Sequence, residues 1–124
     1  MRYRRYRSRP YRYRYSDVGF YMLMWMIEAQ TQQSLDEYVH ENFYEPLGLK
    51  TLGYHPLRRF PEERIVPTEF DRHFRKQILR GHVDDPGASL IGGVGGHAGV
   101  FGNALDVAAI MQMNLQDGYY GGKQ

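Results

Sequence analysis

The chain contains no cysteine. Disulfide bonds, thiolate-bound metals and a cysteine nucleophile are therefore excluded for this sequence. A long apolar run is also missing, because the main apolar stretch, residues 18–27 (VGFYMLMWMI), is too short to span a bilayer as a helix. Acidic residues are absent from residues 1–14, a segment that holds seven arginines.

Charge divides the chain into two parts. Removing the seven arginines of residues 1–14 from the formal net charge of +2 leaves −5 for residues 15–124. With 42% hydrophobic and 24% charged residues, a chain of 124 residues can form one domain around a core. The Arg/Tyr segment has too few apolar residues to offset the entropy of ordering. We therefore predict a disordered low-complexity arm over residues 1–14 and a domain over residues 15–124.

The composition of the arm admits two interpretations. Arginine binds phosphates and tyrosine stacks on bases, so the arm could bind nucleic acid or another anionic surface, with an affinity that falls steeply with salt. An unstructured or aberrant terminus, such as a frameshift would produce, explains the same composition. We favour the second interpretation and keep the binding module as the alternative function.

Residues 12–30 raise a separate alternative, because a basic segment followed by an apolar run is typical of an export signal. The run begins with bulky aromatic residues, Ile27-Glu28-Ala29 is a poor cleavage site, and the sequence continues in a helical pattern. Apolar residues at 20, 23, 24 and 27 follow the spacing of one helix face. We therefore predict a helix from Asp17, as its N-cap, to about Gln30. Its additional apolar positions indicate burial on more than one side.

The next fifty residues predict one more helix and irregular connections. Ser34 and Glu37 form a capping-box pattern, which predicts a helix that runs to about Tyr44. Residues 49–67 are punctuated by prolines and predict an irregular connection. Residues 68–80 carry mixed charges and predict a short helix or a loop. No segment has a persuasive pattern of strand pairing.

The last forty residues are dominated by glycine. Residues 84–87 predict a turn, and residues 92–102 hold six glycines. A loop of this kind either needs unusual backbone dihedral angles or approaches another group closely. Asn103 is predicted to cap a final helix, with Asp106 in its first turn and Gly118 at its end.

Two ligand-binding patterns in this region are weak. Residues 93–98 match the G-x-G-x-x-A pattern of dinucleotide sites, but the helix follows too late and only a short tail remains. His82, Asp84, Asp85 and His97 match no strong spacing of metal ligands. We therefore expect no cofactor and no metal. For His97 we favour a structural role, such as a bond to a backbone carbonyl, over the orientation of a loop beside a pocket.

Five segments, taken in order, carry a resemblance to a known family: YSDVGFY (15–21), SLDEYV (34–39), EPLGL (45–49), HVDDP (82–86) and GGVGGHAGVF (92–101). Together they resemble the serine β-lactamase-related family, which includes class C β-lactamases, penicillin-binding proteins and their esterase and peptidase relatives. The resemblance covers residues 13–123. It implies an α+β, β-lactamase/transpeptidase-like fold, of which this chain would form a mainly helical partial domain.

The resemblance also implies an active site built from three motifs. These are a Ser-x-x-Lys nucleophile, a Tyr-x-Asn or Tyr-x-Asp proton relay, and a Lys/His-Thr/Ser-Gly strand that binds the substrate carboxylate. The second motif falls on Tyr15 and Asp17, the expected catalytic residues, with Ser16 between them as a further candidate. Gly96 and His97 fall in a loop expected beside the substrate. Asp17 in place of asparagine opposes formation of phenolate, so an esterase- or peptidase-like activity is expected rather than a β-lactam hydrolase.

The other two motifs are missing. No serine has a lysine three residues later, and Lys50-Thr51 is followed by leucine rather than glycine. We therefore expect this chain to be inactive alone, as an internal piece of a hydrolase that acts on a β-lactam, a peptide or an ester. For the complete bacterial relative, the resemblance implies acyl transfer to serine followed by hydrolysis, and a periplasmic or extracytoplasmic location.

Overall fold

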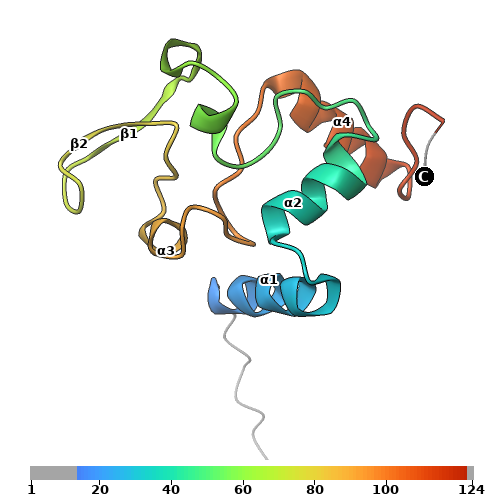
Figure 1. Ribbon diagram of the computed structural model, residues 1–124, viewed down its shortest axis with the longest axis horizontal. Helices are drawn as coiled ribbons and strands as arrows, with labels where there is room; N and C mark the ends of the chain where they lie inside the picture. The colour runs from blue at the N-terminus through green and yellow to red at the C-terminus, as the bar shows by residue number, and fades with distance from the viewer. Residues whose placement is uncertain (1–13, 123–124) are drawn as a thin grey trace, which may run out of the picture.

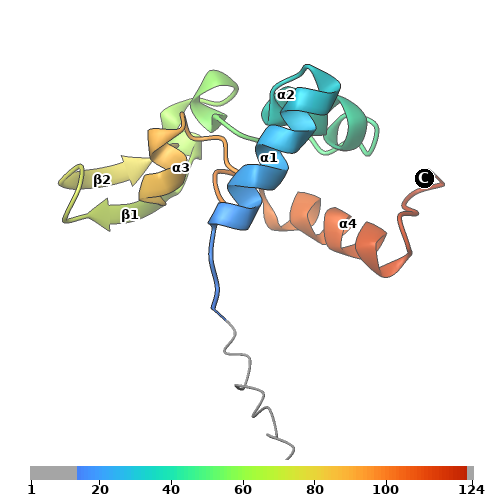
Figure 2. The ribbon, with the colours of Figure 1, turned by 90° about the horizontal axis from the view of Figure 1, so that it is seen from below.

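The computed structural model describes residues 14–122, so the arm predicted for residues 1–14 lies almost wholly outside the described residues. In Figures 1 and 2, the β-hairpin and the last helix lie on opposite sides of the molecule, with the first helix between them. The elements are α1 (Val18–Thr31), α2 (Leu35–Val39), the π-helix η1 (His40–Tyr44), the 3-10 helices η2 (Pro56–Arg58) and η3 (Glu62–Arg64), β1 (Pro67–Asp71), β2 (Gln77–Arg80), α3 (Pro86–Leu90) and α4 (Ala104–Leu115).

The helix predicted after Asp17 is confirmed as α1. Asp17 is its N-cap residue, but its side chain makes no capping hydrogen bond. Instead, the hydroxyl of Ser16 accepts a hydrogen bond from the Val18 amide at 3.3 Å. Burial on more than one side is wrong for the described chain, which covers only one side of α1 and buries only Met24. Large apolar side chains stay exposed on α1, namely Val18, Phe20, Met22, Leu23, Trp25 and Met26.

The helix predicted to run to Tyr44 is confirmed in extent, with a change of geometry. After Val39 the α-helix α2 continues as the π-helix η1. The capping-box hydrogen bond is absent, because the side chain of Ser34 makes no cap contact. The carboxylate of Glu28, at the end of α1, accepts the Leu35 amide at 3.0 Å instead. The neighbouring helix thus supplies an acceptor to the first turn of α2, but for the Leu35 amide and not for the Glu37 amide that a capping box binds.

The prediction of a short helix or loop over residues 68–80 is wrong. β1 and β2 form a two-stranded antiparallel sheet, with an irregularity in register near Pro67. The strands are short, five and four residues, and neither shows a clean alternation of apolar and polar residues. Strand signals depend on that alternation, so this hairpin left none in the sequence.

The turn predicted at residues 84–87 begins a short helix, α3. Asp85 is its N-cap and accepts the Ala88 amide, while Pro86 occupies the first helical position. The cap predicted for the last helix is confirmed, because Asn103 accepts the Asp106 amide at 2.8 Å. That helix ends at Leu115, three residues before the predicted stop.

The hydrophobic core is small. Leu49, Leu52 and Ala109 form its buried cluster, and partly buried side chains of residues 44, 47, 110 and 120 pack against it. A second point of burial is Leu79 on β2, the largest side chain in the described chain that is fully enclosed. No helix among residues 14–122 has the length and apolar character needed to cross a membrane.

Candidate active site

The segment assigned to the proton relay lies directly before α1. The Tyr15 side chain is 67% exposed, whereas Asp17 is half-buried. The Asp17 carbonyl accepts the amides of Phe20 at 2.9 Å and Tyr21 at 3.2 Å. The first turn of α1 therefore fixes the backbone at the end of the motif and leaves Tyr15 accessible from solvent.

His97 points inward and pairs with Asp85. Only 4% of its side chain is exposed, and Nε2 lies 3.0 Å from Oδ1 of Asp85. The structural role expected for His97 thus involves a carboxylate rather than a backbone carbonyl. The same Oδ1 accepts the Ala88 amide at 2.7 Å. That bond is the main cause of a lowered pKa of Asp85; burial acts in the opposite direction, and the His97 contact adds to the lowering.

Tyr21 joins this pair to α1. Its ring meets the His97 ring edge-on, with 4.6 Å between centroids. Its hydroxyl lies so close to Gly87 that a Cβ atom at residue 87 would overlap it. Burial is the main cause that raises the pKa of Tyr21, and the carboxylates of Asp85 and Asp17 add to it. A phenol between two acids stays protonated, so Tyr21 acts here as a neutral packing group.

The glycine-rich loop reaches α1 and the Tyr54 ring. A Cβ atom at Gly96 would lie 2.6 Å from the Phe20 carbonyl oxygen, so this contact requires glycine. The Tyr54 hydroxyl donates to the Gly95 carbonyl at 3.0 Å, and burial raises the pKa of that phenol to about 12. Gly99, with φ +115°, also packs against the Tyr54 ring. The close approach predicted for this loop is therefore made to the protein itself.

Potential metal ligands gather at the same place. One oxygen each of Asp17 and Asp85 and one nitrogen of His97 lie within 4.8 Å of one another. His82 and Asp84, from the sequence pattern, do not belong to this group. Asp85 and His97 already bond to each other, and Asp85 also caps α3. Within the described chain these bonds give both groups a structural function without an ion.

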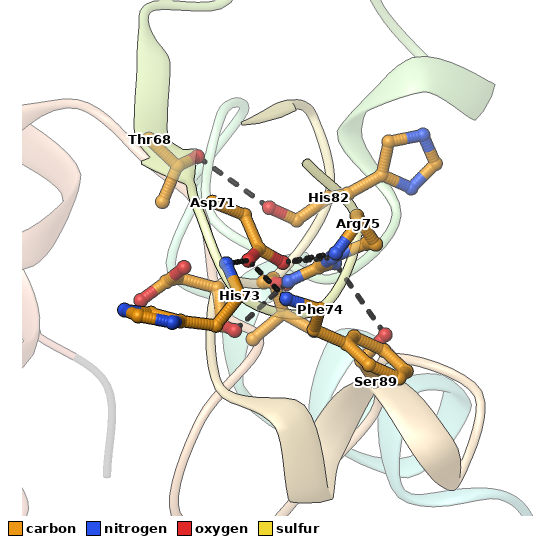
Figure 3. Close-up of polar contacts among 9 residues, drawn as sticks. Thr68, Asp71, His73, Phe74, Arg75, His82 and Ser89 are labelled. Carbon is orange, nitrogen blue, oxygen red and sulfur yellow. Dashed lines mark hydrogen bonds and ion pairs between the residues drawn. The ribbon is translucent and has the colours of Figure 1, made fainter. Parts of the chain in front are cut away.

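A carboxylate at the end of β1 organises the hairpin loop. Asp71 accepts the amides of His73 at 3.0 Å, Phe74 at 2.8 Å and Arg75 at 2.9 Å (Figure 3). It also forms an ion pair with the Arg75 side chain at 3.0 Å. The backbone bonds from Phe74 and Arg75 are the largest causes that hold the pKa of Asp71 well below its usual range.

The same arginine ties the hairpin to the segment before α3. Its guanidinium donates to the carbonyls of Val83 and Asp84, both at 2.9 Å, and reaches the Ser89 hydroxyl at 3.5 Å (Figure 3). Residues 83 and 84 lead directly to Asp85. The hairpin therefore helps to place the carboxylate that holds His97.

Asp71→Asn is expected to lower stability at neutral pH, with an effect that shrinks in acid. A carboxylate with a depressed pKa in the folded chain contributes stability above its unfolded pKa, about 3.9. That contribution is lost as the pH falls below this value toward the lower folded pKa. Urea unfolding of the wild type and of Asp71→Asn at pH 7 and pH 3 measures the difference in their free energy of unfolding. A difference as large at pH 3 as at pH 7 would contradict a stabilising role of the ionised Asp71 carboxylate.

An apolar cavity lies apart from this site. It has a volume of about 590 Å³ and is lined mainly by Phe60, residues 64–66 and residues 99–103. Tyr15, Asp17 and His97 are not among its lining residues. The cavity therefore adds nothing to the predicted relay segment.

Sequence reasoning found part of this arrangement. Asp17 and His97, assigned to separate motifs, do come together, whereas Tyr15 lies at the exposed edge. Tyr21 and Asp71 were missed, and Asp85 was considered only as part of a turn and of a weak metal-ligand pattern, not as the N-cap that holds His97. The Asp-Pro pair at residues 85 and 86 is a helix-start signal that could have revealed the N-cap. Whether Gly96 and His97 contact a substrate stays a prediction.

Comparison with known proteins identifies the relatives of this chain. The chain is 41% identical over 122 residues to a protein of Escherichia coli (strain K12) named "Putative D-alanyl-D-alanine carboxypeptidase", covering 89% of this chain and 28% of that protein. A protein of the same name from Salmonella agona (strain SL483) is 40% identical over 119 residues, covering 86% of this chain and 28% of that protein. No solved structure matches the chain. The chain thus spans little more than a quarter of the length of these relatives.

The family itself is decided by a match over nearly the whole sequence. The family model described as Beta-lactamase matches residues 3–123. This range contains all five segments that carried the resemblance, together with Tyr15, Asp17, Asp85 and His97. The chain belongs to the β-lactamase family.

Proposed function

We propose that this chain carries the proton-relay segment of a serine hydrolase that acts on peptides ending in D-alanyl-D-alanine. The observation that carries the proposal is the position of Tyr15, which is exposed directly before an ordered helix in a β-lactamase-family chain. The names of relatives at about 40% identity support this substrate class over an ester or a β-lactam.

The reaction of the complete protein would be acyl transfer followed by hydrolysis. A serine oxygen attacks the carbonyl carbon of the terminal peptide bond, the C–N bond breaks, and D-alanine leaves with a proton. Water then cleaves the acyl ester and restores the serine. Tyr15, as the phenolate, would take the serine proton and, as the phenol, pass it to the leaving nitrogen. Asp17 would contact the substrate through its carboxylate.

A phenol cannot do this unaided, because its usual pKa is near 10. It needs a nearby ammonium to stabilise the phenolate, and the family places the lysine of Ser-x-x-Lys there. Neither that motif nor the Lys/His-Thr/Ser-Gly motif occurs in this sequence. We therefore propose that the nucleophile comes from residues outside this sequence. For the complete bacterial protein we also propose a periplasmic or extracytoplasmic location, as the family resemblance implies.

The purified chain alone is expected to show no turnover of a chromogenic β-lactam, a short-chain nitrophenyl ester or a D-alanyl-D-alanine peptide. Tyr15→Phe, which keeps the ring and removes the hydroxyl, serves as the matched blank. Rates equal to those of this blank support the proposal. Turnover that disappears in Tyr15→Phe would mean that the chain contains its own nucleophile, with Ser16 the first residue to replace.

A chimera tests the relay role of Tyr15. Residues 15–122 replace the matching segment of the Escherichia coli relative, and release of D-alanine is measured for the chimera and for the unmodified relative. Tyr15→Phe in the chimera is expected to lower kcat/KM about 100-fold, as loss of a general acid-base group does. An unchanged kcat/KM in Tyr15→Phe would reject Tyr15 as the relay. An unmodified relative that releases no D-alanine would reject the proposed substrate class.

A further inference from the structure

We propose that His97, held by Asp85, is a positioning residue that fixes the first turn of α1 and, with it, the Tyr15–Asp17 segment. The catalytic consequence of this inference rests on the proposed relay function of Tyr15. The positioning itself rests on contacts of the described chain and can be tested without catalysis.

The first step is the anchor on the side of α3. Asp85 Oδ1 bonds to the Ala88 amide at 2.7 Å and to His97 Nε2 at 3.0 Å. Because the backbone of α3 fixes the carboxylate, the carboxylate in turn fixes the imidazole. The Nδ1 atom of His97 is buried with no partner in the described chain, which favours the tautomer that carries its proton on Nε2. In that tautomer His97 donates and Asp85 accepts.

The second step is the contact with α1. The His97 ring packs edge-on against Tyr21, and the preceding residue of the loop, Gly96, abuts the Phe20 carbonyl. Phe20 and Tyr21 are the two residues whose amides bond to the Asp17 carbonyl. The loop of residues 92–102 therefore packs against the first turn of α1, and this turn determines where the Tyr15–Asp17 segment leaves the helix.

Within residues 14–122, the first turn of α1 has few other contacts that would hold it in place. The described chain covers only one side of the helix, so packing does little to hold its first turn. Asp17 makes no side-chain capping bond, and the hydroxyl of Ser16 bonds the Val18 amide at the long distance of 3.3 Å. A weakly capped helix end frays easily. The contact with His97 supplies the restraint that the cap does not.

Two replacements of His97 separate positioning from simple space filling. His97→Gln places an amide N–H near the position of Nε2 and can still donate to Asp85, but it loses the aromatic ring. His97→Phe keeps a ring against Tyr21 and loses the donor. Positioning through the hydrogen bond predicts that Gln preserves the order of the turn, because the held loop keeps Gly96 against the Phe20 carbonyl, and that Phe does not. A role in packing alone predicts the reverse.

The measurement is native-state amide hydrogen exchange of the purified chain, observed at Phe20 and Tyr21. In His97→Phe both amides are expected to exchange about ten-fold faster, as for loss of one bond to a charged acceptor, and in His97→Gln to stay close to the wild-type rate. Amides at the centre of α4, such as those of Ile110 and Met111, are the internal reference and should not change. Equal rates in wild type and His97→Phe, or slower exchange in Phe than in Gln, would overturn the proposal.

Asp85→Ser provides a second variant in case His97→Phe fails to fold. Serine caps helices about as well as aspartate, so α3 should persist while the shorter side chain loses contact with His97. Its effect at Phe20 and Tyr21 should equal that of His97→Phe, and the double variant should add nothing further. Additive effects would overturn the proposal.

The exchange result and the chimera result are independent. If exchange responds as expected and the unmodified relative releases no D-alanine, the proposed function fails while the positioning stands. If both hold, His97→Gln in the chimera should retain the activity that His97→Phe loses. Normal activity in His97→Phe, together with its faster exchange, would overturn the catalytic part of the inference.

Discussion

Leu79→Ala is expected to lower the free energy of unfolding by about 3 kcal/mol, within the range for leucine replaced in a protein core. The Leu79 side chain is 1% exposed and has no counterpart of comparable size enclosed to the same degree in the described chain. Its loss leaves a cavity beneath a two-stranded sheet, which has few other contacts to close around it. Urea unfolding followed by circular dichroism measures the change.

The matched control lies one residue earlier on the same strand. Ile78 points to the opposite face of β2 and is 60% exposed, so Ile78→Ala removes a similar volume without leaving a cavity. A loss below about 1 kcal/mol is expected there. Equal losses for the two variants would mean that the hairpin does not pack as the structure shows.

Asp106→Ala is expected to cost about 3 kcal/mol, because one carboxylate oxygen serves three donors. Oδ2 of Asp106 accepts the Thr51 amide and the Thr51 hydroxyl, both at 2.7 Å, and the Leu52 amide at 3.1 Å. These bonds join α4 to residues 51 and 52, beside the core cluster of Leu49, Leu52 and Ala109. Together they lower the pKa of Asp106, although burial alone would raise it. Unfolding at neutral pH measures the loss.

Two replacements of Thr51 test whether the hydroxyl takes part. The Thr51 hydroxyl oxygen also accepts the Asn103 amide at 3.0 Å. The hydroxyl therefore bonds both to the N-cap residue of α4 and to Asp106 in its first turn. Thr51→Val keeps the shape and removes the donor and acceptor, and should cost about 1 kcal/mol or more. Thr51→Ser keeps the hydroxyl and should cost clearly less. If Val and Ser behave alike, the hydroxyl contributes nothing to the junction.

The Asp106–Thr51 contact and the Asp71–Arg75 contact lie at different distances along the chain from the candidate site. Asp106 and Thr51 secure α4 against the core, far along the chain from the relay segment. Asp71 and Arg75 secure residues 83 and 84, which precede the anchor of His97. Loss of the Asp71–Arg75 contact should therefore disturb the first turn of α1 more than loss of the Asp106–Thr51 contact does. Amide exchange at Phe20 in Asp71→Asn and Thr51→Val compares them directly.

Local signals in the sequence were sufficient to predict those elements that interactions between near neighbours stabilise. The helices of residues 18–31 and 104–115 follow from apolar spacing and from the Asn103 cap, interactions that span three or four residues. The five ordered segments were enough to indicate the β-lactamase family, which the match over residues 3–123 shows. The glycines of residues 92–102 correctly signalled a close approach, although not its partner.

How those elements meet depends instead on pairs of residues that are distant in the sequence. Asp85 and His97 are twelve residues apart, Asp106 and Thr51 are fifty-five apart, and Tyr21 reaches His97 from the other end of the chain. No local pattern encodes such pairs, because their energy depends on which groups folding removes from water together. For the same reason the apolar face of α1 looked like a buried helix in the sequence, while the described chain covers only one side of it. The periodicity of apolar residues shows which side chains a helix can bury, and the neighbouring elements determine which of them are buried.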